Sequence, residues 1–259
     1  MDRLVAAPAV SWWARVLPPV LTFTALVAVW WLAARRFRPD QLPSPLDVLQ
    51  ALRELWSSGA LAEHVGVSLG RLLLAYGLAV LAGIPAGLLL GWYALSLRAL
   101  EPLLQVLRPI SPVAWFPLAV LWFGVGNAPA VFIIFLAALF PILLTTVQAV
   151  HGVPAGYLRL ADNFGAPRWM LFSHIIVPAS FPAIAIGLRI AVGTAWIHLV
   201  AGEMLGAQSG LGFLINDARN FLRTDQVLGG MVVIGLLGLG MDRLMSVGER
   251  AIRRRWGAS

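Results

Sequence analysis

The chain has 259 residues, of which 59% are hydrophobic and only 12% charged, against about 45–50% and 25% in an ordinary soluble domain. Its 19 basic residues are all arginine, its net charge is +7 and it contains no cysteine. This composition excludes disulfides, thiolate metal sites and thiol nucleophiles. It favours a membrane protein over a nucleic-acid-binding domain, whose arginines would gather on a polar face.

Long stretches without a charged residue predict helices that cross the membrane, because a hydrocarbon core of about 30 Å requires about 20 apolar helical residues. We expect an all-α membrane protein with about six such helices, at residues 16–34, 70–93, 103–124, 129–149, 180–202 and 226–246. The third and fourth helices are separated by a glycine-rich turn at 124–129. The membrane domain would extend over 16–249, between a cytoplasmic segment 1–15 and a basic cytoplasmic tail 250–259.

The orientation follows from the number of helices and from the arginines. An even number of membrane-spanning helices places both termini on one side, and the Arg253-Arg254-Arg255 cluster favours the cytoplasm for that side. The arginines of the first loop would then lie outside, against the same rule; they are Arg35, Arg36, Arg38 and Arg53.

A short helix is predicted in that first loop. Ser44 and Asp47 have the spacing of a capping box, with Pro45 at the first helical position, and Ser57-Ser58-Gly59 would end the helix. One face carries an apolar stripe made of Leu46, Leu49, Leu52 and Trp56. The helix is therefore expected on the membrane surface or on neighbouring helices, with contact to a solute-delivery protein as the alternative.

A polar segment interrupts the apolar chain between the fourth and fifth predicted membrane helices. Residues 154–164 are expected to form a short helix that Gly165 ends by adopting a positive φ, with Pro167 preventing its continuation. A short rigid helix at the membrane surface suits docking into a groove of a partner, whose motion it would transmit to the membrane helices. The candidate docking residues are Leu160, Ala161, Asp162, Asn163, Phe164, Gly165, Ala166 and Arg168.

This segment resembles the signature of the permeases of ATP-binding-cassette importers, which reads Glu-Ala-Ala, three residues, Gly, nine residues, Ile, one residue, Leu-Pro. Four positions match at the family's spacing: Ala161, Gly165, Ile175 and Pro178. Three positions depart from it, because Arg159 replaces glutamate, Leu160 replaces alanine and Val177 replaces leucine. The departure at Arg159 puts in question any ion pair made by the family's glutamate, whereas the spacing is kept.

Further motifs are similar to those of the nitrate, sulfonate, taurine and bicarbonate branch of these permeases. They are Leu42-Pro43-Ser44-Pro45, Ser68-Leu69-Gly70-Arg71, Trp115-Phe116-Pro117-Leu118, Leu121-Trp122-Phe123-Gly124 and Ser209-Gly210-Leu211-Gly212-Phe213-Leu214-Ile215, followed by Thr224-Asp225. The resemblance implies a MetI-like type I importer fold with a cytoplasmic coupling helix at 154–168. It also implies a multi-pass protein of the bacterial inner membrane that carries a small anion.

The same resemblance implies the partners. They are membrane lipid, a second permease copy forming a homodimer, two cytoplasmic ATPase subunits that bind ATP and Mg²⁺, and an external solute-binding protein. This chain would bind no cofactor or metal and would not be an enzyme. Independently, the absence of lysine excludes the phosphate-binding motif Gly-x-x-x-x-Gly-Lys-Ser/Thr from this chain.

Polar residues of the fifth predicted membrane helix are candidates for a translocation path, since a charge there costs about 2.5–3.5 kcal/mol to insert. The candidates are Arg189, Trp196, His198 and Glu203. Arg189 and Glu203 would lie about 21 Å apart along a straight helix, too far to pair with each other. Structural alternatives stay open: Arg189 pairs with an acid of another helix, Glu203 lies at the outer interface, and His198 is a packing residue.

Two arginines before the last membrane helix, Arg219 and Arg223, are candidates for contact with an anion or with the solute-binding protein. Asp217 and Asp225 are close enough in the sequence to neutralise them, so both interpretations stay open.

The sequence argues against two other classes of function. An intramembrane protease would require His-Glu-x-x-His, or Gly-x-Ser-Gly with a later histidine, and neither pattern occurs in the sequence. An ion-gradient-driven secondary transporter predicts internal repeats with broken helices in corresponding halves, and the sequence shows no such repeat.

Overall fold

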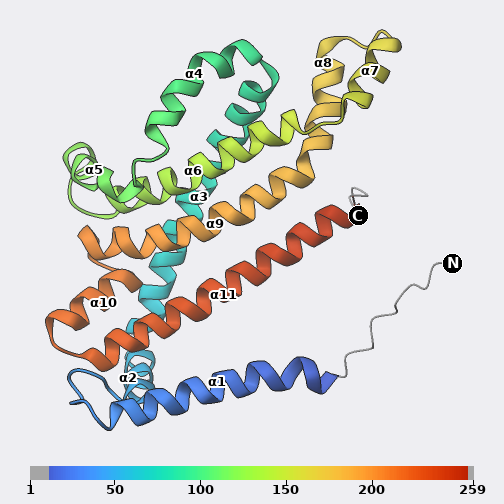
Figure 1. Cartoon of the computed structure of the whole chain (residues 1–259). Coiled ribbons are helices and arrows are strands. Elements are labelled where there is room, and N and C mark those ends of the chain that lie inside the picture. Colours follow the sequence, from blue (N-terminus) through green and yellow to red (C-terminus); the bar gives the residue numbers. More distant parts are fainter. Residues whose placement is uncertain (1–11, 256–259) are drawn as a thin grey trace.

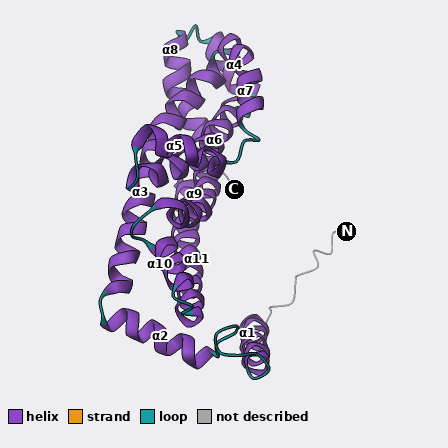
Figure 2. Ribbon diagram, turned by 90° about the vertical axis from the view of Figure 1, so that its left-hand side faces the viewer, coloured by secondary structure: helices purple, strands orange, loops and turns teal. Residues whose placement is uncertain are grey.

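The computed structural model describes residues 12–255, and every regular element in that range is helical. Four long helices form the body of the bundle (Figure 1): α3 (Ala60–Trp92), α6 (Asn127–His151), α9 (Val177–Gly206) and α11 (Thr224–Arg255). Helix α1 (Trp12–Ala34) is set apart and joins the body through α2 (Pro45–Ser57), as Figure 2 shows. Five helices are long and apolar enough to cross a membrane, and a bent pair raises the number to six. The predicted all-α membrane architecture is thus confirmed.

Small residues allow α3 and α6 to pack closely. Gly83, Gly87 and Gly91 recur every fourth residue on the face of α3 that meets α6. A Cβ added to Gly87 would lie 2.6 Å from Thr146 Cβ, and one added to Gly91 would lie 2.7 Å from Val150 Cβ. Such repeats of small residues let helix backbones approach each other where lipid supplies no hydrophobic driving force.

Helix α9 packs against α6 and also contacts α3, so that the core of the molecule lies where α3, α6 and α9 meet. Thr194 of α9 donates a hydrogen bond from Oγ1 to the carbonyl oxygen of Ala137 of α6 at 3.1 Å. The largest fully buried apolar side chains of the core are Ile133, Ile134, Ile142, Leu199 and Leu211. Because these helices are rigid and closely packed, groups attached to their ends are held in fixed relative positions.

The expected membrane helix at 103–124 is not continuous. Helix α4 (Ala94–Leu107) is followed by a short 3₁₀ turn at Pro112–Trp115, η1, and then by α5 (Phe116–Phe123), and the two parts enclose an angle of 85°. Prolines explain the break, because a proline removes a backbone donor and disfavours the helical conformation of the preceding residue. Ser111, which precedes Pro112, indeed has an extended ψ of 131°.

The helix of the first loop begins as predicted. Asp47 Oδ2 accepts a hydrogen bond from the Ser44 backbone N at 2.8 Å, and the Ser44 hydroxyl accepts one from the Asp47 N at 3.3 Å. The side chains of α2 that are buried against the protein are Val48, Ala51 and Leu55. The predicted apolar stripe is exposed at Leu46, Leu49 and Trp56. Thus α2 packs on the protein with a different face and leaves most of this stripe free.

The two ends of the bundle differ in what they carry (Figure 1). One end holds α7 (Ala155–Asn163), α8 (Arg168–Met170) and the C-terminal end of α11; we call it the α7 end. The other end, the α10 end, holds α2, α5 and α10 (Leu211–Asn220). Most of the predicted N-terminal segment 1–15 and the last residues of the tail 250–259 lie outside the described residues.

Candidate functional site

The segment between α6 and α9 is a short helix closed by a glycine. Gly165 follows α7 with a φ of +67°. The Ala166 N donates to the Ala161 carbonyl at 3.0 Å and the Gly165 N donates to the Asp162 carbonyl at 3.0 Å. This pair of bonds is the Schellman arrangement, which requires a left-handed residue at the position of Gly165. The predicted helix and its glycine stop are therefore confirmed as local structure.

One face of α7 presents apolar side chains outward. Tyr157, Leu160 and Phe164 are 54%, 57% and 83% exposed, and their spacing places them along one face of a helix. Ala161 is buried against the protein. Of the other predicted docking residues, Ala166 is half-buried, and the exposed ones are Asp162, Asn163, Gly165 and Arg168. The segment therefore combines an apolar stripe with flanking polar groups, as a docking helix requires.

Aromatic contacts connect this segment to the membrane helices. After α8 the chain forms a π-helical turn at Leu171–Ile176, η2, and continues directly as α9. Phe172 in this turn packs against Trp92 at the end of α3, with 5.5 Å between ring centroids. Trp169 meets His174 edge to face at 5.9 Å. A displacement of α7 would therefore reach α9 through the chain and α3 through an aromatic pair.

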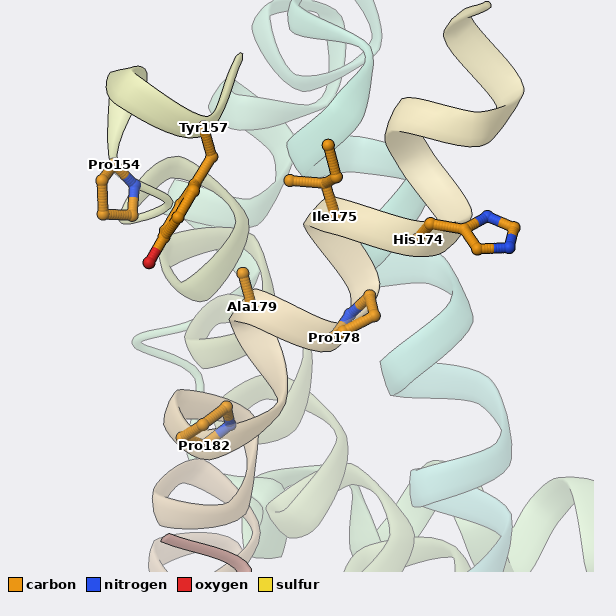
Figure 3. A pocket seen from close by; sticks show the side chains of 7 residues that line it. All are labelled: Pro154, Tyr157, His174, Ile175, Pro178, Ala179 and Pro182. Carbon is orange, nitrogen blue, oxygen red and sulfur yellow. The ribbon is translucent and has the colours of Figure 1, made fainter. Parts of the chain in front are cut away.

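A cavity of about 430 Å³ separates α7 from the start of α9. Figure 3 shows Pro154 and Tyr157 on one side of it and Ile175 and Ala179 on the other, while His174 points away from Tyr157. Helix α7 is thus connected to α6 and α8 at its two ends, while a cavity lies between it and α9. This arrangement leaves room for α7 to shift relative to α9.

A buried polar network lies at the α10 end. Arg71 of α3 and Glu203 of α9 form an ion pair with 2.7 Å between Nη1 and Oε1, and their side chains are 5% and 0% exposed. The Ser68 hydroxyl donates to Glu203 at 2.8 Å and accepts from the Leu211 N at 2.8 Å. The Gly212 N donates to Glu203 Oε2 at 2.9 Å. The carboxylate is therefore both paired and hydrogen-bonded, as a buried charge requires.

Arg71 extends the network to further elements. It donates to the carbonyl oxygen and the hydroxyl of Ser209 at 2.6 and 2.8 Å, and to Asn127 Oδ1 from Nε at 3.2 Å. The Gly210 N donates to His64 Nδ1 at 3.1 Å. One guanidinium thus connects α3, the start of α6 and the turn between α9 and α10.

Two residues expected on the translocation path lie instead in the protein interior. Glu203 is 1% exposed because it belongs to the network with Arg71, and Trp196 is buried in the core next to Gly238 of α11. Glu203 stands out in the sequence as a charge at a membrane helix, whereas its partner Arg71 was missed. A buried carboxylate requires a positive partner. Arg71 lies directly before the apolar run of the second membrane helix, and this position is the signal that could have identified it as the partner of Glu203.

The other two path candidates have different surroundings. Arg189 pairs with Asp242 at 3.0 Å and with Glu249 at 3.2 Å, both on α11, which is the structural alternative that the sequence left open. His198 is half-buried and lines a cavity between α6 and α9. The four candidates therefore do not form one cluster.

The two arginines at the α10 end also differ. Arg223 pairs with Asp225 at 2.9 Å and with Glu54 of α2 at 3.1 Å. The hydrogen bonds that it donates to these carboxylates, Asp225 first, raise the pKa of Arg223 above its ordinary value. Arg219 is exposed in the last turn of α10. Arg223 thus holds α2 and α11 together, and Arg219 remains accessible at the surface.

Between these arginines the chain presents an apolar tip. Phe221 and Leu222 are exposed, and Leu222 has a φ of +57°. A bulky residue in the left-handed region is unusual and indicates a local constraint. Among the described residues, His, Asp and Glu side chains nowhere form a group of three or more that could hold a metal ion.

A bundle of long apolar helices, with the short helix α7 at one end and a buried polar network at the other, is the architecture of a polytopic membrane protein. Residues 79–256 match the family described as binding-protein-dependent transport system inner membrane component. The chain belongs to this family. It is therefore a multi-pass permease of the inner membrane rather than an enzyme, in a system that includes a solute-binding protein and an ATPase.

Several curated relatives span nearly the whole chain. The taurine transport system permease protein TauC of Escherichia coli (strain K12) is 36% identical over 90% of this chain and 86% of its own length. The putative aliphatic sulfonates transport permease protein SsuC of the same organism is 34% identical over 97% and 95%. The nitrate import permease protein NrtB of Synechococcus elongatus is 32% identical over 89% and 87%.

The fold is also found among solved structures. A chain of the MetNI methionine ABC transporter, in an inward-facing conformation, superposes with a TM-score of 0.64 over 73% of this chain and 94% of that chain, at 18% sequence identity. The expected MetI-like fold is thus confirmed.

Proposed function

We propose that this chain forms the translocation path of an ATP-driven importer for a small anion of the sulfonate, taurine or nitrate type. The substrate class is supported by the names of the relatives, which transport taurine, aliphatic sulfonates and nitrate. The observation that carries the mechanism is the exposed apolar stripe of α7. This helix follows α6 and is connected through α8 and η2 to α9, and through the contact of Phe172 with Trp92 to α3.

In this proposal the α7 end is cytoplasmic and residues 154–168 dock into a groove of the ATPase. Leu160 and Phe164 enter the groove as apolar anchors, while Asp162 and Arg168 provide polar contacts at its edge. Two ATPase subunits bind ATP with Mg²⁺ and close on each other during hydrolysis, so that all phosphate chemistry lies in the partner. The Schellman stop at Gly165 keeps α7 rigid while it is pushed.

A second copy of the chain completes the path, as the similarity to importer permeases implies. Closure of the ATPases would move the two α7 segments together and separate the helices at the α10 end, which gives alternating access. The ion pair between Arg71 and Glu203 keeps the outer parts of α3 and α9 together during this movement.

The solute-binding protein would dock at the α10 end. Arg219, Phe221 and Leu222 are exposed there and supply a charge and two apolar contacts. Arg223 has a supporting role, because it is held by Asp225 and Glu54.

The experiment is uptake into proteoliposomes that contain the permease with its cognate ATPase and binding protein. Radiolabelled taurine, methanesulfonate, nitrate and bicarbonate are tested one by one, with and without ATP. ATP-dependent accumulation of at least one anion is expected. Accumulation driven by an ion gradient without ATP, or transport of none of these anions, would contradict the proposal.

A further inference from the structure

We infer that Arg108 and Gln148 form an anion-binding site on the translocation path, an inference that rests on the proposed function. Both residues line a cavity of about 410 Å³ between α6 and α9, at the break between α4 and α5. The site is distinct from the docking segment and from the buried network at the α10 end.

The position of the cavity along the helices indicates its depth. Its wall uses residues 136–148 of α6, which extends over 127–151, and residues 190–198 of α9, which extends over 177–206. The α9 stretch lies near the middle of its helix, whereas the α6 stretch runs from the middle to the last turn, which leads to α7. The cavity is therefore expected to extend from mid-depth toward the α7 end of the membrane, where an arginine is costly unless a countercharge or water accompanies it.

Arg108 differs in its pairing from Arg71 and Arg189, two arginines within the long membrane helices. Arg71 and Arg189 each have a carboxylate within 3.2 Å. Arg108 has no ion pair among the described residues, and it is the one charged residue in the wall of the cavity. Its charge is thus available to a mobile anion.

The other polar groups of the wall decide which atoms contact the ligand. Thr194 and Thr145 donate their hydroxyl protons to backbone carbonyls, at 3.1 Å to Ala137 and 3.2 Å to Ile142. Gln148 is exposed, and its amide N–H groups supply neutral donors beside the guanidinium. Apolar side chains complete the wall, among them Phe140 and Leu144. Low polarity around a guanidinium strengthens its attraction for sulfonate or nitrate oxygens.

His198 of α9 also lines the cavity and would orient the ligand. Its Nδ1 lies 2.8 Å from the Thr194 carbonyl oxygen, which accepts only, so Nδ1 carries the hydrogen. Nε2 remains for a ligand. A neutral imidazole accepts there, which suits a solute that carries a donor, such as the ammonium of an aminosulfonate, besides its anionic group.

The test compares Arg108→Gln with Arg108→Lys and with Arg98→Gln. Arg98 is an exposed arginine of α4, the helix that ends directly before Arg108, and it lies outside the cavity wall. The uptake rate of the anion transported by the wild type is measured in the complete reconstituted complex, together with ATPase activity stimulated by the binding protein. Arg108→Gln should lower uptake by about tenfold or more and leave the ATPase coupled. Arg108→Lys and Arg98→Gln should stay near the wild-type rate.

A chemical rescue separates the charge from a structural role. Because the chain contains no cysteine, Arg108→Cys introduces a single thiol into the permease. Aminoethyl methanethiosulfonate adds a cationic side chain and should restore uptake, whereas sulfonatoethyl methanethiosulfonate adds an anionic one and should not. The same reagents on the unmodified complex correct for reaction with the partner proteins.

The outcomes distinguish this inference from the proposed function. If the wild type transports one of the anions with ATP and Arg108→Gln transports it equally well, the anion site is wrong and the importer stands. Equal rescue by both reagents would also overturn the site, because it would assign Arg108 to packing. If the wild type transports none of the anions, the proposed function itself fails.

Discussion

Arg71 on α3 and Glu203 on α9, 132 positions apart in the sequence, form a buried ion pair with 2.7 Å between Nη1 and Oε1. Around this pair, Ser68 and the backbone N of Gly212 satisfy the carboxylate. The pair therefore holds α3 and α9 to each other at this end. During alternating access the two helices would move together as one rigid unit.

Removing Arg71 should therefore be strongly destabilising. Arg71→Met leaves the Glu203 carboxylate buried without a positive partner, which costs about 3–5 kcal/mol. The tryptophan fluorescence of the detergent-solubilised protein reports thermal unfolding, and Arg98→Met on the exposed surface of α4 is the control. The double variant Arg71→Met/Glu203→Leu should lose less stability than the two single variants added together. Strict additivity would show that the two side chains do not interact.

The left-handed conformation of Gly165 predicts a defect in coupling. Valine at a φ of +67° costs about 1–2 kcal/mol, whereas asparagine tolerates this region better. Added atoms have space, since no neighbour lies within 4 Å of a Cβ built on Gly165. Gly165→Val should thus insert normally but lose most ATP-driven uptake, while Gly165→Asn should keep most of it. Uptake by Gly165→Val at the wild-type rate would show that transport does not require the glycine that ends α7.

The sequence predicted those features that depend on local rules. The capping box of Ser44 and Asp47 and the stop at Gly165 need only neighbouring residues, so the sequence contains all the information. The pairing of Arg71 with Glu203 could not be predicted in this way, because it depends on how helices distant in the sequence are placed. The break after α4 could have been predicted only by interpreting Pro109 and Pro112 as residues that end a helix. Arg189 looked like a path residue because its partners on α11 lie more than fifty positions away.

The apolar residues exposed at the two ends should affect different partners. Phe164→Asp places a charge in the stripe of α7 and should reduce co-purification of the ATPase. Phe221→Asp does the same at the α10 end and should leave the ATPase bound while weakening stimulation by the binding protein. Both side chains are among the most exposed aromatics, at 83% and 73%, so neither change should affect folding. Loss of the ATPase in both variants, or in neither, would contradict the assignment of the two ends.

Close packing between α3 and α6 predicts a difference between two glycines of one helix. Gly87→Ala would bring Cβ to 2.6 Å from Thr146 Cβ and 2.8 Å from the Leu143 carbonyl oxygen, and such overpacking costs about 1–3 kcal/mol. Gly77→Ala meets no atom within 4 Å and should be neutral or stabilising by up to about 1 kcal/mol. Unfolding temperatures of the two purified variants give the comparison, and equal values would refute the close approach.

The location of α7 can be tested by labelling a cysteine introduced at Leu160, since the chain has no other cysteine. A membrane-impermeant maleimide is applied to intact spheroplasts and to inverted membrane vesicles, with and without the co-expressed ATPase. We predict labelling only in inverted vesicles and protection when the ATPase is present. Labelling from the outside, or labelling in inverted vesicles that the ATPase does not reduce, would contradict the placement of the docking helix at the motor subunit.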